Sequence, residues 1–89
     1  MLAKTYRHTA KTDVGTFRTN FVERHYPFAV VYCGWDGLPE ATSRRLAEKE
    51  GVCYGWARDE RDAELMKRRA EGEGCLNVII HEVAIRELP

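Results

Sequence analysis

The pattern of apolar and polar positions predicts a β-hairpin in the first part of the chain. Thr5–Thr9 and Thr16–Phe21 are rich in threonine and aromatic side chains, which favour strands. The residues between them, Thr12–Gly15, are typical of a turn. Because side chains alternate between the two faces of a strand, we expect Phe17 and Phe21 to share one face.

Two apolar runs and a third, less regular segment supply the other predicted strands. Phe28–Cys33 is apolar on both faces, as in a central strand, and follows a bend at Glu23–Pro27, where proline lacks an N–H. Val52–Ala57 is the second predicted core strand. A last strand is expected over Cys75–Ile85, where the alternation slips. A bulge near His81 would reconcile its two halves.

Two segments carry the signals of helices. In the first, Pro39–Glu50, the proline suits the opening turn of a helix. In the second, Asp59 is a good N-cap, Ala63 and Met66 lie on an apolar stripe at helical spacing, and the helix is expected to end near Glu71. An alternative omits the first helix, so that the two core strands form an antiparallel hairpin and one helix crosses back to the last strand.

These elements predict an α+β fold. We expect a small mixed or antiparallel sheet of four to five strands, formed by the N-terminal hairpin and three core strands, with one or two helices packed on one face. The 89 residues, 1–89, are expected to form a single small globular domain. Its core is thin, which favours binding at a surface over binding in a deep pocket. An uncovered sheet edge, such as that of the hairpin, offers a route to a homodimer.

Composition narrows the class of protein. With 44% hydrophobic and 31% charged residues, the chain is expected to be globular. No apolar run approaches the ~20 residues of a membrane span. The first residues contain no hydrophobic signal region, so we expect a cytoplasmic location and no membrane partner. Three cysteines, an odd number, predict free thiols in a reducing compartment.

No motif for catalysis is present. The sequence contains no phosphate-binding loop, zinc-protease motif or nucleophile elbow. Cys33, Cys53, Cys75 and His81 form a valid zinc set, but they lack knuckle spacing and fall in or beside strands, where cysteine behaves as a small hydrophobe. We therefore expect no metal, no cofactor and no enzymatic activity. A small enzyme that uses His25 or a cysteine is the third alternative.

The distribution of charge allows a local basic surface. The whole chain is balanced, with 14 basic and 14 acidic side chains, which argues against a protein that coats nucleic acid. If Tyr6 joins Phe17 on the core side of the hairpin, Arg7 and Arg18 lie together on the solvent side, where they solubilise the hairpin or bind phosphates. Tyr6 or Tyr26 could then stack on a base. The candidate nucleic-acid residues are Arg7, Arg18, Lys4, Lys11 and Arg24.

Large aromatic side chains indicate a second kind of surface. Trp35 and Trp56 each follow a glycine at the end of a predicted strand, and Tyr26 lies in a loop. Exposed tryptophans often dominate the energy of an interface, although both rings would also suit a small core. Our leading hypothesis is a non-enzymatic module that docks on a protein partner through these three residues, an inhibitor or adaptor of the type that phages and mobile elements encode. The alternative is a nucleic-acid contact domain that uses the basic hairpin.

Overall fold

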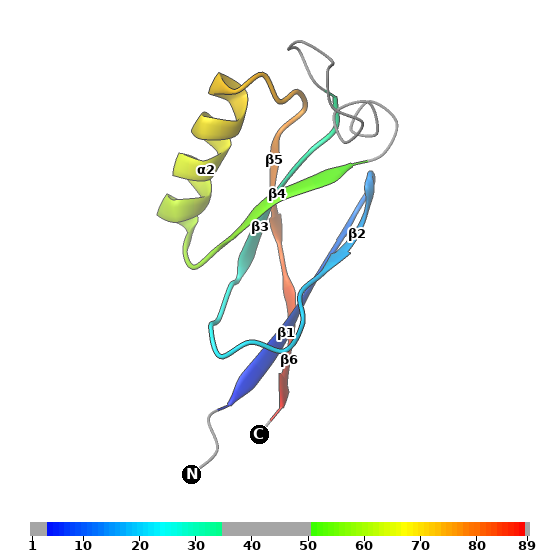
Figure 1. Cartoon of the computed structure of the whole chain (residues 1–89), viewed down its shortest axis with the longest axis vertical. Coiled ribbons are helices and arrows are strands. Elements are labelled where there is room, and N and C mark those ends of the chain that lie inside the picture. Colours follow the sequence, from blue (N-terminus) through cyan, green and yellow to red (C-terminus); the bar gives the residue numbers. More distant parts are fainter. Residues whose placement is uncertain (1–3, 35–50, 89) are drawn as a thin grey trace.

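Two antiparallel sheets of three strands each and one helix make up the part of the protein that the computed structural model describes, residues 4–34 and 51–88 (Figure 1). The elements are β1 (Thr5–Thr12), β2 (Gly15–Arg18), β3 (Phe28–Tyr32), β4 (Val52–Ala57), α2 (Glu60–Gly72), β5 (Ile79–Glu82) and β6 (Ala84–Leu88). The predicted α+β class is confirmed, but the strands divide between two sheets. The predicted helix Pro39–Glu50 and Trp35 lie outside the described residues.

The first sheet, which we call the hairpin sheet, has the strand order β2-β1-β6. The predicted N-terminal hairpin is confirmed, with Ala10 opposite Phe17 in the β1–β2 pair. β6 joins the other side of β1 in antiparallel register, which places Arg86 directly opposite Arg7. The two ends of the described chain therefore pair with each other, as Figure 1 shows for β1 and β6.

The regular alternation of the hairpin stops after β2. In the register that places Ala10 opposite Phe17, Tyr6 would lie opposite Phe21. It pairs with Val22 instead, so the chain after β2 contains one extra residue. A one-residue insertion moves the following side chains to the other face of the sheet. Phe21 therefore lies opposite to Phe17, and its ring carries the Arg7 guanidinium, whose Cζ is 4.5 Å from the ring centroid. The prediction that Phe17 and Phe21 share a face is wrong.

The second sheet, which we call the core sheet, has the order β4-β3-β5, so the predicted central position of β3 is confirmed. Both faces of β3 are covered, since Ala29, Val30 and Val31 have no exposed surface. Val30 belongs to the apolar cluster under α2, whereas Ala29 and Val31 belong to a second cluster on the opposite face. Alternation along this one strand thus supplies both cores of the molecule.

The helix packs closely on the core sheet because its contact positions are small. Ala63 and Ala70 are fully buried against Val30, and Met66 packs beside them. Leu65, at the edge of this stripe, remains 49% exposed. The predicted stripe is thus confirmed. Within the described residues there is no helix with both the length and the apolar character to cross a membrane.

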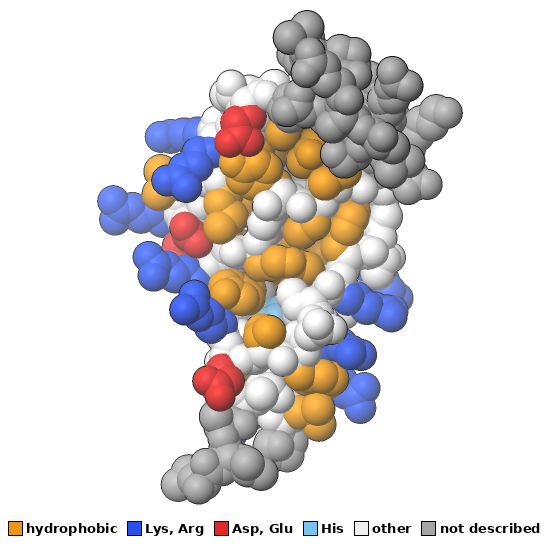
Figure 2. All heavy atoms as spheres, in the orientation of Figure 1, with side chains coloured by type: hydrophobic (Ala, Val, Ile, Leu, Met, Phe, Trp, Pro, Cys, Tyr) orange, Lys and Arg blue, Asp and Glu red, His pale blue; other side chains and the backbone are white. Residues whose placement is uncertain are grey.

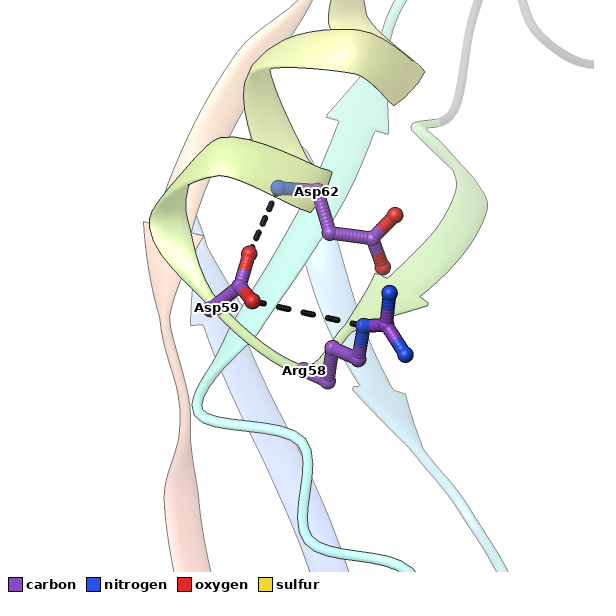
Figure 3. Close-up of polar contacts among 3 residues, drawn as sticks. All are labelled: Arg58, Asp59 and Asp62. Atoms are coloured by element: carbon purple, nitrogen blue, oxygen red, sulfur yellow. Dashed lines mark hydrogen bonds and ion pairs between the residues drawn. The ribbon is translucent and has the colours of Figure 1, made fainter.

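A side-chain cap begins the helix where the sequence predicts it. The Asp59 carboxylate accepts a hydrogen bond from the Asp62 N–H at 2.7 Å, which satisfies one of the free amides of the first turn (Figure 3). Its other oxygen lies 4.0 Å from the Arg58 Nε, an exposed ion pair that adds little stability. The helix ends at Gly72, close to the predicted end at Glu71.

The hairpin sheet covers the face of the core sheet that α2 leaves open. Ala10 is buried with Ala29 and Val31 of β3, and the rings of Phe17 and Trp56 pack around them. The described residues therefore form three layers, in the order α2, core sheet and hairpin sheet. A single sheet that includes the hairpin, as the sequence analysis expected, does not form.

The last predicted strand, Cys75–Ile85 with a bulge near His81, is in fact two strands. β5 pairs with β3 in the core sheet, and β6 pairs with β1 in the hairpin sheet. Val83 lies between them, and its N–H donates to the Pro27 carbonyl at 3.0 Å. The slip in the alternation marks the point where the chain passes from one sheet to the other.

Candidate nucleic-acid interface

Four basic side chains lie on the outer face of the hairpin sheet. Arg7 and Lys11 occupy alternate positions of β1, and Arg86 is the partner of Arg7 on β6. Arg18 of β2 is the partner of Thr9, which has the same orientation as Arg7. We call this surface the cationic face; it comprises Arg7, Lys11, Arg18 and Arg86. Figure 2 shows basic side chains along the side of the molecule where β2 lies.

The strand register brings the four charges close together. Directly opposed residues such as Arg7 and Arg86 have Cβ atoms about 4.5–5.5 Å apart, and Arg18 is a diagonal neighbour of both Arg7 and Lys11 at roughly 7–8 Å. The other strand residues on this face are Thr5, Thr9, Thr16, Ala84 and Leu88. None of these strand positions carries a carboxylate, so the positive charge is not neutralised within the face.

Arg7 differs from the other three cations in its surroundings. It is half-buried, while Lys11, Arg18 and Arg86 are exposed. Its guanidinium lies over the Phe21 ring, a cation–π contact of about 0.5–1 kcal/mol or more. Its Nε is buried and has no hydrogen-bond partner among the described residues. Arg7 is thus held in place by stacking, whereas the exposed cations can adjust to a ligand.

Two of the predicted nucleic-acid residues lie elsewhere. Lys4 forms an ion pair with Glu87, its Nζ lying 3.0 Å from the carboxylate oxygen. The hydrogen bond to Glu87 is the main reason that the pKa of Lys4 is raised. Glu87 is the partner of Tyr6 and so lies on the other face of the sheet. Arg24 is in the exposed loop that follows Val22.

Arg86 was not found by the sequence analysis. The predicted last strand ends at Ile85, three residues before the end of β6, and nothing in the local sequence pairs that strand with β1. The usable signal was that no glycine or proline interrupts the chain between Ile85 and Pro89, so the strand can continue through Arg86.

A hollow of about 630 Å³ lies next to the cationic face. Phe21 connects the two, because its ring lines the hollow and also supports the Arg7 guanidinium. The residues around the hollow are Thr5, Thr19, Phe21, Val22, Glu23, Arg24 and Tyr26. Most of them belong to the segment that follows β2 and contains the one-residue insertion before Val22, so this insertion helps to form the hollow.

On the opposite face of β1, His8 is fully buried between the two sheets. Its Nε2 accepts a hydrogen bond from the Tyr26 N–H at 2.9 Å. The ring proton therefore lies on Nδ1, which donates to the Thr19 hydroxyl at 3.0 Å. Burial, followed by the nearby His25, lowers the pKa of His8 and keeps it neutral. This histidine has the partners of a structural residue that joins β1 to the loop containing Tyr26.

Two of the three predicted protein-docking residues surround His8. The Trp56 ring centroid is 6.0 Å from that of His8, and the Tyr26 ring centroid is 5.2 Å from it. Both residues are half-buried. Tyr6, the other predicted stacking residue, also faces this side and makes an edge contact with His25. The role of Trp35, Trp56 and Tyr26 in docking stays a prediction.

The cysteines and histidines do not converge. Cys33, Cys53 and Cys75 are free thiols, and burial raises the pKa of Cys53 and of Cys75, which favours the protonated form. Within residues 4–34 and 51–88, no three or more histidine, cysteine or carboxylate side chains are arranged to hold a metal ion. The His81 Nδ1–H donates a hydrogen bond to the Glu82 carbonyl at 2.6 Å.

Comparison with known proteins finds no relative of this chain. No protein-family model matches the chain. No curated protein and no solved structure is significantly similar to it.

Proposed function

We propose that this protein is a non-enzymatic binding domain whose cationic face contacts the phosphate backbone of a nucleic acid. The observation that carries the proposal is the group of four basic side chains on one exposed sheet face, without a carboxylate at any strand position of that face. Arginine and lysine are the residues that most often bind phosphate. Because the net charge of the chain is zero, the proposed contact is local and does not extend around the molecule.

The opposition of Arg7 and Arg86 supports a polyanionic ligand. Like charges directly across an antiparallel pair destabilise it by up to about 1 kcal/mol. A domain of ordinary stability, roughly 5–15 kcal/mol, tolerates this cost. A phosphate placed between the two guanidinium groups would turn the repulsion into two charge-assisted hydrogen bonds. The unbalanced face is thus more stable with the proposed ligand than without it.

Salt dependence provides the direct test. We expect the protein to bind a fluorescein-labelled strand of about 12 nucleotides in anisotropy measurements at roughly 50 mM salt. For four phosphate contacts the logarithm of the binding constant should fall against the logarithm of salt concentration with a slope near −3, at about −0.7 to −0.9 per contact. The double substitution Arg18→Gln with Arg86→Gln removes two contacts and should reduce this slope to roughly half.

A matched control is available on the helix. Arg61→Gln with Arg68→Gln makes the same change in charge at two exposed positions of α2, among carboxylates. We expect this variant to keep the affinity and the salt slope of the original protein. If no nucleic acid binds at low salt, or if both double variants lose affinity equally, the cationic face is not a nucleic-acid surface.

Docking on a protein partner is the second candidate function. Figure 2 shows apolar side chains gathered on the face where β4 crosses the molecule, and Trp56 of this strand is only half-buried. For this function, Trp56→Ala should keep a cooperative thermal transition and yet fail to retain the partner that the original chain captures from its host, as identified by mass spectrometry. If the variant unfolds, Trp56 is a core residue and no longer supports docking. Pairing of the edge strand β2 with a second copy is a related proposal.

We also propose that the protein functions in the cytoplasm. The three free thiols are compatible with a reducing compartment, where such side chains stay unpaired.

A further inference from the structure

We infer that the nucleic acid is single-stranded DNA or RNA and that one of its bases enters the hollow beside the cationic face. This inference rests on the proposed function. Phe21 lines the hollow and carries Arg7 on its ring. Thr5 lines it too, and lies two residues before Arg7 on the same face of β1. The hollow is therefore next to the end of the cationic face at which Arg7 and Arg86 meet.

The lining of the hollow suits a flat heterocycle. Its volume of about 630 Å³ is within the roughly 300–1,000 Å³ of small-molecule sites. Phe21 and Tyr26 supply aromatic surface, and Val22 adds an apolar wall. A base stacks on such rings whatever its identity, since each base has a π-face. Stacking is thus the interaction that we expect to hold the base.

The charges around the hollow separate the base from its phosphates. Glu23 and Arg24 both line the hollow, so its lining carries no net charge, and the Glu23 carboxylate can accept hydrogen bonds from the amino groups of bases. Arg7 and Arg86 lie outside the lining, on the sheet face, and attract the backbone. A strand that follows the cationic face would therefore turn a base inward at the hollow and keep its phosphates on the sheet.

A duplex fits this surface poorly. The axes of the two outer strands of a three-stranded sheet are about 10 Å apart before side chains are added. The major groove of B-form DNA is about 12 Å wide and admits a helix or a two-stranded ribbon. With its side chains the hairpin sheet is wider than such a ribbon, and the bases of a duplex are stacked and paired, so none is free to occupy the hollow. A duplex is left with phosphate contacts alone.

The test compares a single strand with the duplex of the same sequence. We expect the full chain to bind a labelled strand of about 12 nucleotides, as DNA or as RNA, about 5- to 150-fold more tightly than the 12-base-pair duplex, which corresponds to one stacked base. Phe21→Leu keeps apolar volume but removes the π-face, and should lower the single-strand affinity to that of the duplex. Phe17→Leu, which changes a phenylalanine on the other face, should preserve the preference.

A second measurement does not depend on any variant. In the original protein labelled with nitrogen-15, the amide signals of Thr5, Val22 and Glu23 should shift when the single strand is added, and not when the duplex is added. Equal affinities for the two ligands, with the same signals shifted by both, would overturn the inference while the proposed function stands. Absence of binding to either ligand would instead overturn the proposed function.

Discussion

Replacing His8 with alanine is expected to lower the free energy of unfolding by about 3–5 kcal/mol. The substitution removes a fully buried ring and leaves a cavity between the two sheets. It also leaves the Tyr26 N–H without its acceptor, and an unsatisfied buried donor costs about 1–3 kcal/mol, while the Thr19 hydroxyl loses the ring Nδ1 but keeps the backbone N–H of residue 8. For a domain of this size the loss is a large part of the total stability. Urea unfolding followed by circular dichroism would measure it.

His81→Ala is the matched control for this substitution. The His81 side chain is only half-buried, and its hydrogen bond to the Glu82 carbonyl is exposed. We expect this variant to lose much less stability, about 0.5 kcal/mol. A loss below about 1 kcal/mol for His8→Ala would show that His8 does not join the hairpin sheet to the loop at Tyr26.

The pH dependence of stability provides an independent measure of the same site. The pKa of His8 in the folded protein is lowered from its ordinary 6.5, so the unfolded chain binds its proton more readily. The contribution of His8 to stability is therefore fully present above pH 6.5. It decreases as the pH falls through 6.5 towards the lower pKa of His8 in the folded protein, and below that pKa it changes no further. The variant His8→Phe cannot titrate, so the difference in stability between it and the original protein should shrink over this range.

Local signals were sufficient to predict several elements. β3 is apolar on both faces and lies at the centre of its sheet, and the Asp59 cap with the Ala63–Met66 stripe locates α2 to within a residue or two. These features depend on residues that are close in sequence, so composition and periodicity reveal them. The antiparallel pairing of β3 with β4, which was one part of the alternative without the first helix, is also observed, while the predicted helix itself lies outside the described residues.

The division into two sheets depends on contacts between distant residues. The passage of the chain at Val83 is stabilised by the carbonyl of Pro27, which no periodicity in the last segment predicts. From sequence alone, a slip in alternation is equally consistent with a bulge within one strand and with a change of sheet. The chain changes sheet because β6 pairs with the edge of β1 that β2 does not occupy.

The residues of the candidate site differ in how far the sequence predicts them. Alternation within the hairpin was enough to place Arg7 and Arg18 on one face. Arg86 joins them only through the pairing of β6, and Phe21 joins them only because of the insertion before Val22. Arg86 extends the basic hairpin into a wider face, and Phe21 links this face to the hollow. The positions of both depend on the register between distant strands, which a single sequence does not reveal.

Gly51→Ala is expected to destabilise the protein by about 2–4 kcal/mol, the second-largest effect that we predict. Gly51 precedes β4, and its N–H donates to the Val14 carbonyl at the tip of the hairpin at 2.9 Å. A Cβ at this position would overlap the Val14 Cγ2 and lie 2.7 Å from the Val14 carbonyl oxygen. Such overpacking typically costs about 1–3 kcal/mol, and the hydrogen bond adds about 0.5–1.5 kcal/mol when it is lost.

Gly72→Ala makes the same chemical change in open space and serves as the control. No atom lies within 4 Å of the position that a Cβ would take there, and Gly72 is the last residue of α2. Alanine favours a helix over glycine by up to about 1 kcal/mol, so this variant should be as stable as the original protein or slightly more stable. Thermal unfolding of the two variants measures both effects, and equal changes would contradict the close contact at Gly51.

A double variant separates the two parts of this contact. Val14→Ala removes the Cγ2 that a Cβ at position 51 would overlap, but keeps the Val14 carbonyl oxygen at 2.7 Å and the Val14 Cβ at 2.8 Å. In the Gly51→Ala background it should therefore restore part of the lost stability, although by itself it removes apolar contacts and destabilises the chain. Full recovery would assign the clash to the Val14 Cγ2 alone. No recovery would assign it to the atoms that remain, the Val14 Cβ and the carbonyl oxygen that accepts the hydrogen bond from Gly51.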